Sequence, residues 1–178
     1  MNAMDTLPDV IPKSILDQAA AVDMRYNSAT EGSIAYLEHF SILVMFNSLR
    51  CMPSLVRRWY EEEIKRHSTP KFVELVNKYM SPLLIRLSLE AVQADRRQHE
   101  NMVVRTRPVV GEVVAIYTLD TMVMELVVTL PNGYPLKNID ITCGKRLGVP
   151  EAQWRKWLLQ MRTIISAQVC SMYIYVCY

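Results

Sequence analysis

The sequence has 178 residues, 51% of them hydrophobic and 21% charged, with a formal net charge of +2. This composition excludes an intrinsically disordered chain, and the length suits one core, or one small domain with a helical extension. The sequence has neither a segment apolar and long enough to span a bilayer nor the pattern of a signal peptide, which predicts a cytosolic protein with no membrane partner.

Charges and cysteines are distributed unevenly along the chain. Residues 1–52 contain 3 Lys/Arg and 6 Asp/Glu, a net −3, whereas residues 53–178 contain 17 and 12, a net +5. The second part therefore favours an anionic partner surface, although an ordinary solvated face is the simpler interpretation of so modest a charge. The four cysteines are too scattered for a disulfide framework, and none has the close Cys/His spacing of a zinc site.

Residues 32–80 have the apolar spacing of short packed helices, which predicts helical hairpins of the solenoid kind. Residues 1–31 are expected to be irregular or partly helical. The first clear helix should bury a stripe formed by Tyr36, Leu37, Phe40, Leu43, Val44 and Leu49. A second helix is expected from Pro53. Two more starts are predicted at Thr69 and Ser81, because each is a capping hydroxyl followed by a proline.

Beyond residue 100 the apolar period changes to two, which predicts an antiparallel meander of four strands. The expected strands cover residues 102–107, 113–119, 122–130 and 139–142, and Asp120 and Thr121 form a tight turn. In the third strand, one face is expected to carry Leu126, Val128 and Leu130, and the other face Glu125 and Thr129. One side of this strand should therefore be buried and the other at least partly solvated.

The final predicted element is a helix that begins at Pro150 and Glu151. Its apolar stripe is expected to contain Trp154, Trp157, Leu158, Met161, Ile164 and Ile165. A helix, a four-strand antiparallel meander and a second helix make an α+β domain, which we place over residues 81–168.

The turn after the third strand, in the stretch LPNGYPLKNIDI, has an unusual composition. Gly133 supplies a permissive φ, and Pro135 ends strand pairing because it has no N–H to donate. Tyr134 can cover the edge of the meander with its ring while its hydroxyl reaches a backbone partner. These three residues are predicted to form a structural turn without a catalytic role.

A four-strand meander with a Tyr-Pro turn resembles the RWD domain, a relative of the ubiquitin-conjugating fold that lacks its catalytic cysteine. The stretches VVGEVVAIYTLDTMVMELVV and LPNGYPLKNIDITCGKRLGVPEAQWRKWLLQM, with MPSLVRRWYEEEIKRHSTPKFVELV upstream, resemble more closely the C-terminal region of the listerin family of RING-type E3 ubiquitin ligases. This resemblance covers residues 34–168. Ile139 stands where the usual RWD motif has a second proline, a departure that listerin-type sequences share.

The resemblance implies that residues 32–80 end a HEAT-like scaffold and that residues 81–168 form an RWD domain. It further implies ubiquitination of nascent chains stalled on the large ribosomal subunit, as part of ribosome-associated quality control. Zinc and the ubiquitin-conjugating enzyme would be bound by a RING that this sequence lacks, so the chain alone is expected to be inactive. Residues 169–178 form an apolar tail outside the resemblance. We therefore interpret the chain as a fragment, either a splice product or an incomplete gene model.

Four basic residues are the candidate site for a partner. Lys145 and Arg146 are expected on the loop before the last helix, and Arg155 and Lys156 on its first turns. Together they would form a positive patch beside a helix N-terminus, suited to rRNA of the large ribosomal subunit. The alternative is a solvated face without a partner.

No catalytic residue is predicted. Cys143 is a candidate thioester nucleophile, but no histidine follows His99 to act as a base, so a small buried thiol is the simpler interpretation. His39, His67 and His99 are too far apart for a metal site. A free-standing RWD module that binds a protein partner remains the alternative function.

Overall fold

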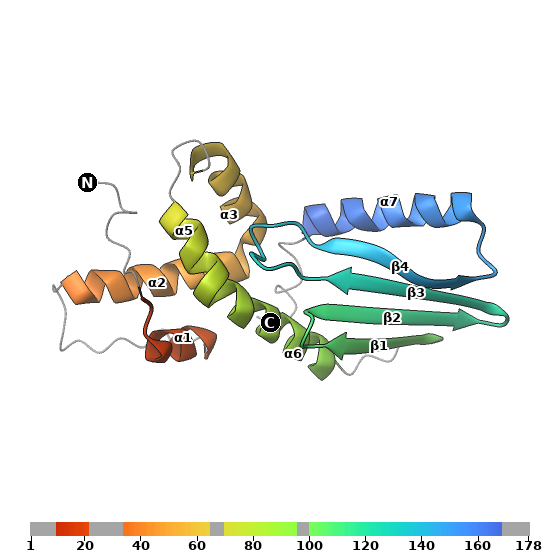
Figure 1. The fold of residues 1–178 in the computed structure, drawn as a ribbon, viewed down its shortest axis with the longest axis horizontal. Helices are drawn as coiled ribbons and strands as arrows, with labels where there is room; N and C mark the ends of the chain where they lie inside the picture. Colours follow the sequence, from red (N-terminus) through yellow and green to blue (C-terminus); the bar gives the residue numbers. More distant parts are fainter. Residues whose placement is uncertain (1–9, 22–33, 65–69, 96–99, 169–178) are drawn as a thin grey trace.

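The computed structural model describes residues 10–21, 34–64, 70–95 and 100–168. Helices occupy one end of the protein and a four-stranded antiparallel sheet, flanked by one long helix, occupies the other (Figure 1). The predicted α+β class is confirmed. Within the described ranges, no helix is long and apolar enough to cross a membrane.

The core of the helical part lies mainly between α2 and the continuous helical segment formed by α5, η4 and α6. The elements are α1 (Lys13–Ala20), α2 (Ile34–Cys51), α3 (Pro53–Trp59), η3 (Tyr60–Ile64), α5 (Pro70–Leu75), η4 (Val76–Met80) and α6 (Ser81–Ala94). Phe46, Phe72 and Met80 are fully buried. Pro53 stands in the first turn of α3, as predicted. A backbone N–H at this position would have no acceptor within the helix, so proline loses no hydrogen bond there.

The stripe predicted for α2 is partly wrong. Leu43 and Leu49 are buried, as expected, but Leu37, Phe40 and Val44 are 58%, 44% and 41% exposed. The buried face instead combines Leu43 and Leu49 with Ile42 and Phe46. Because α2 is apolar on more than one face, the sequence period alone could not decide which face is covered.

Helix α6 begins at Ser81, as predicted, but the predicted capping role of Ser81 is wrong. Ser81 has φ −59° and ψ −47°, and Met80 before it is helical too, so η4 continues directly into α6. Pro82 lacks an N–H and its ring would crowd the preceding turn of an α-helix. The wider π-helical turn of η4 lies immediately before it and relieves that crowding. The other predicted start, at Thr69, lies outside the described residues.

The sheet has the strand order β1-β2-β3-β4, with β1 (Met102–Arg107), β2 (Glu112–Leu119), β3 (Met122–Thr129) and β4 (Asp140–Leu147). The meander and the turn at Asp120, which has φ 50°, are as predicted. The last strand is longer than expected. Between the pairs Met124–Arg146 and Leu126–Cys143, β4 contains one residue more than β3, which makes a bulge.

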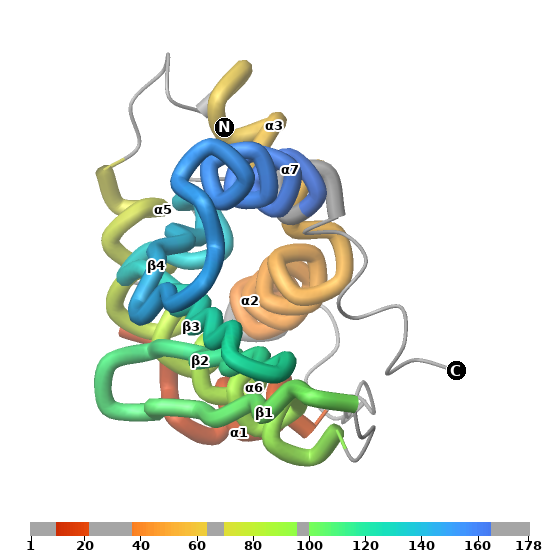
Figure 2. Tube along the Cα trace, turned by 90° about the vertical axis from the view of Figure 1, so that its right-hand side faces the viewer, coloured from red at the N-terminus to blue at the C-terminus, as the bar shows by residue number. Residues whose placement is uncertain are grey.

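The expectation of one buried face on this strand is wrong for β3 itself, because every residue from Val123 to Thr129 is half-buried; Leu130, just after β3, is buried as predicted. Helix α7 (Glu151–Gln168) runs back along the β4 side of the sheet, while the helical part contacts the end where β3 stops (Figures 1 and 2). Trp154 of α7 is buried and Met161 is half-buried, as the predicted stripe requires. Ile164 does not fit the stripe, since it is 51% exposed.

Candidate functional site

The Tyr-Pro turn joins the sheet to the helical part. Tyr134 and Leu136 belong to the same buried core as the residues of α2, α5 and α6, and Pro135 is fully buried. Gly133 has φ 97°, and the Tyr134–Pro135 peptide bond is cis. Two backbone hydrogen bonds close the turn, from Tyr134 N to Pro131 O (2.9 Å) and from Lys137 N to Gly133 O (3.1 Å).

Arg57 of α3 binds the turn from the helical side. Its Nε and Nη2 donate to Pro135 O at 3.0 and 2.8 Å, and its Nη1 donates to Asn138 Oδ1 at 2.5 Å. The residue is only 9% exposed. Burial lowers the pKa of the guanidinium, while Glu61 and Tyr134 act in the opposite direction. The group stays charged because an arginine pKa starts far above neutral pH.

Ser81 provides a second contact between helix and turn. Its Oγ accepts a hydrogen bond from Gly133 N at 3.0 Å, and the side chain is fully buried. The predicted capping hydroxyl therefore satisfies a donor of the turn instead of a donor of its own helix. A Cβ atom on Gly133 would lie 2.8 Å from Asn77 Oδ1, so this position has no room for a side chain.

The four basic residues lie on β4 and α7. Lys145 and Arg146 belong to the strand, so the expectation that they lie on a loop is wrong; Arg155 and Lys156 are on the first turns of α7, as expected. The strand was predicted too short because its last residues include Gly144 and two cations, which are poor strand formers.

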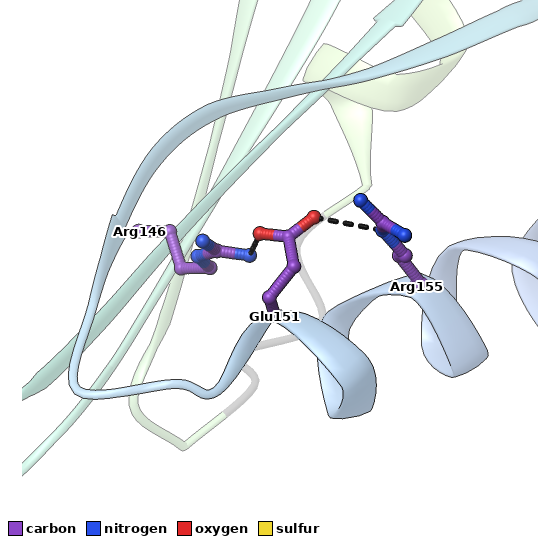
Figure 3. A network of polar contacts seen from close by, with 3 residues as sticks. All are labelled: Arg146, Glu151 and Arg155. Atoms are coloured by element: carbon purple, nitrogen blue, oxygen red, sulfur yellow. Dashed lines mark hydrogen bonds and ion pairs between the residues drawn. The ribbon is translucent and has the colours of Figure 1, made fainter.

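Glu151 lies between two of these cations (Figure 3). Its carboxylate forms an ion pair with Arg146 Nη1 through Oε2 and accepts from Arg155 Nε at 3.0 Å through Oε1. The hydrogen bonds from Arg146 and Arg155 lower the pKa of this carboxyl. Lys145 and Lys156 are exposed, and no ion pair with another described residue is found for either. The ion pairs join only Arg146, Glu151 and Arg155, and the four predicted cations together with Glu151 carry a net charge of +3.

Two family models divide the chain into a helical and a sheet part. The "LTN1 family HEAT repeat region" matches residues 6–93, and "Ubiquitin conjugating domain-like" matches residues 102–174. Over 135 aligned residues the chain is 34% identical to the E3 ubiquitin-protein ligase listerin of Mus musculus. Over 164 aligned residues it is 31% identical to the listerin of Gallus gallus. These alignments cover 75% and 91% of the chain. This chain belongs to the listerin family.

The listerin relatives are much longer than this chain. It spans 8% of the mouse protein and 9% of the chicken protein. The listerin of Saccharomyces cerevisiae is 25% identical over 126 residues, which are 68% of the chain and 8% of that protein. The resemblance predicted from the sequence is confirmed. The division at residue 81 stays a prediction, and the second family model extends into the tail predicted to begin at residue 169.

The residues weighed for catalysis are dispersed in this listerin-family chain. Cys143 is exposed on β4, so the expectation of a buried thiol is wrong. His39 Nε2 lies 3.0 Å from Gln18 Oε1 and links α2 to α1. His67 and His99 lie outside the described residues. Among those described, no three His, Cys, Asp or Glu side chains lie close enough together to hold a metal ion.

Sequence reasoning missed Arg57 and Glu151. Arg57 sits in an Arg57–Arg58 pair on a short helix, and such cations are ordinarily solvated. The sequence around this pair does not indicate that Arg57 is buried and Arg58 exposed. Glu151 was recognised only as the start of α7, although an acidic residue four positions before Arg155 is a helical ion-pair signal. The ion pair of Glu151 with its second partner, Arg146, forms only because β4 extends to Leu147, and the strand was predicted to end at residue 142.

Proposed function

We propose that this chain supplies the ribosome-docking region of a listerin-type E3 ubiquitin ligase. The ligase would act in the cytosol in ribosome-associated quality control, ubiquitinating nascent chains stalled on the large ribosomal subunit. The observation that supports this proposal is the family match along both parts of the chain, with 31% identity over 164 residues to a protein named E3 ubiquitin-protein ligase listerin. The HEAT-like end and the RWD-like domain would act as one docking body, because Arg57 and Ser81 bind the same turn.

The basic patch is the surface that we assign to rRNA. Lys145 and Lys156 are exposed, and Arg146 and Arg155 are held at the beginning of α7, whose N-terminal amide groups add to the positive potential. Glu151 opposes phosphate binding because it pairs with both arginines. The patch is therefore a moderate electrostatic contact that aids docking, and shape complementarity elsewhere would provide the remaining affinity.

Changing Lys145, Arg146, Arg155 and Lys156 to alanine is expected to weaken co-sedimentation with large ribosomal subunits about tenfold or more. The wild type should lose binding steeply as salt rises, and the variant should show a shallower dependence, because each neutralised phosphate releases counterions. Glu151→Gln should act in the opposite direction and strengthen binding, since it removes the anion between two cations.

The matched control removes four exposed cations outside the patch, namely Arg58, Arg86, Arg105 and Lys137. This control has the same net charge as the patch variant but should bind nearly as well as the wild type. Equal losses in both quadruple variants, with no effect of Glu151→Gln, would mean that the patch is only solvated surface.

The chain alone is expected to have no ligase activity. A RING orients the charged conjugating enzyme, and we assign both zinc and that enzyme to a RING supplied outside this sequence. Incubation with activating enzyme, conjugating enzyme and ubiquitin should give no chains above the background of a reaction without this protein. Formation of chains that a zinc chelator abolishes would contradict this assignment.

A further inference from the structure

An apolar groove lies on the helical part, and its lining includes no residue of the Tyr-Pro turn or the basic patch. It has a volume of about 650 Å³ and is formed by one face of α2, by α3 and by α5. Its walls include Val44, which is 41% exposed, Leu55, 48% exposed, and Trp59, 41% exposed. The remaining lining residues are Phe40, Ser41, Met45, Ser48, Met52, Val56 and Phe72. Apolar surface gathered in this way marks a docking site.

The chemistry of the groove restricts its occupant. None of the lining residues is charged, and the only polar ones are Ser41 and Ser48. Trp59 and Phe72 meet edge to face at 5.9 Å, which leaves aromatic surface at the base of the groove. A charged segment would lose hydration here without gaining a partner. An occupant should therefore be uncharged, rich in apolar and aromatic side chains, and able to offer a few hydroxyl groups to the two serines.

The described chain ends close to this groove. Helix α7 ends at Gln168, and its C-terminal end lies beside α3, which forms one wall (Figure 1). Contacts between α3 and α7 confirm this proximity. Ten residues follow Gln168. Ten extended residues reach about 33 Å, whereas the groove face of α2 from Phe40 to Ser48 is about 12 Å long. The chain that follows α7 is thus long enough to enter the groove.

We propose that residues 169–178 of the same chain dock in this groove. The segment reads VCSMYIYVCY and contains no charged residue, so it has the composition that the groove requires. Its three tyrosines combine apolar rings with hydroxyl groups that suit Ser41 and Ser48. Its methionine and isoleucine suit the irregular apolar wall formed by Met45, Met52 and Leu55. The docked tail would shield the groove from partners and from other copies of the chain.

Cross-linking tests this proposal in the full chain. Cys51 and Cys143 are replaced by serine, which leaves Cys170 and Cys177 of the tail as the native thiols. A third cysteine is introduced on α3, as Leu55→Cys inside the groove or as Arg58→Cys on the same helix outside it. Both positions are exposed, so both variants should fold. With a short bismaleimide, we expect the intramolecular cross-link to form about fivefold faster or more from residue 55, because docking raises the local concentration of the tail.

A charge on the opposite wall provides the second test. Val44→Asp should reduce the cross-link from Leu55→Cys at least about fivefold, since docking would then bury an unpaired carboxylate. Val103→Asp on β1, which replaces a valine that is 51% exposed and lies outside the groove, should leave the cross-link unchanged. Equal rates from residues 55 and 58, no cross-link at all, or cross-links only between two chains would each overturn the proposal. The last outcome would assign the groove to a second copy.

Discussion

Arg57→Ala is expected to lower the free energy of unfolding by about 3 kcal/mol. The change removes three hydrogen bonds from a side chain that is 9% exposed, and it leaves Pro135 O and Asn138 Oδ1 without this donor. An unpaired buried acceptor such as Pro135 O costs about 1 to 3 kcal/mol, whereas Asn138 is exposed, and hydrogen bonds from charged groups are stronger than neutral ones. Urea denaturation should show a lower midpoint with an unchanged slope, because the amount of surface exposed on unfolding is nearly the same.

Arg58→Ala is the matched control, since Arg58 is the exposed neighbour on the same helix. It should change the free energy of unfolding by less than about 0.5 kcal/mol. Arg57→Lys should recover only part of the loss, because an ammonium group cannot reproduce two parallel donors to one carbonyl together with a third to Asn138. Equal destabilisation by Arg57→Ala and Arg58→Ala would show that the bonds to the turn contribute nothing to stability.

The sheet could be predicted from the sequence because its signals are local. The run from Val113 to Leu119 is rich in β-branched residues and includes Tyr117, and Asp120 adopts the positive φ that a tight turn needs. The strand order then follows from short connections. The family resemblance, which rests on long stretches of matching order and spacing, placed the same elements independently.

The errors occur where tertiary contacts override a local preference. Ser81 before Pro82 reads as a helix start, yet its hydroxyl is used by Gly133, 52 positions away in the sequence. The faces of α2 are similarly ambiguous, because Phe40 and Val44 line a groove while Ile42 and Phe46 are buried in the core. A single sequence contains no measure of which apolar face finds a neighbour.

The sequence pattern placed Arg155 and Lys156 on the last helix correctly, but it placed Lys145 and Arg146 on a loop and did not indicate that Glu151 pairs with two of the four cations. The composition of the basic patch was visible because four cations lie within 12 positions, from Lys145 to Lys156. The pairing of Glu151 with Arg146 depends on the bulged end of β4, which brings the strand to the beginning of α7. Such a pairing between a strand and a helix has no fixed sequence spacing, whereas the pairing of Glu151 with Arg155 does.

Gly133→Ala is expected to destabilise the protein by about 3 kcal/mol. A φ of 97° is unfavourable for any residue with a Cβ atom, at a cost of about 1 to 3 kcal/mol. The new Cβ atom would also lie 2.8 Å from Asn77 Oδ1 and 3.2 Å from Lys137 Cδ. Relief of that contact requires the turn to move, which would lengthen the hydrogen bond from Gly133 N to Ser81 Oγ.

Gly144→Ala on β4 serves as the control for added volume. Its Cβ atom would lie 2.7 Å from Glu125 Cδ, but Glu125 has a flexible side chain and the backbone at Gly144 does not have a positive φ. We expect a loss of less than about 1 kcal/mol, because the glutamate can rotate away.

A double-mutant cycle with Asn77→Ala separates the two causes of the Gly133→Ala loss. Shortening Asn77 removes the 2.8 Å contact but leaves the strained φ unchanged. Gly133→Ala should therefore cost about 1 kcal/mol less in the Asn77→Ala background, and the remaining loss measures the backbone strain together with the altered bond to Ser81. Stability is compared by urea denaturation of all four proteins. If Gly133→Ala costs no more than Gly144→Ala, the turn does not need glycine, and the fixed junction between the helical part and the sheet does not depend on this close approach.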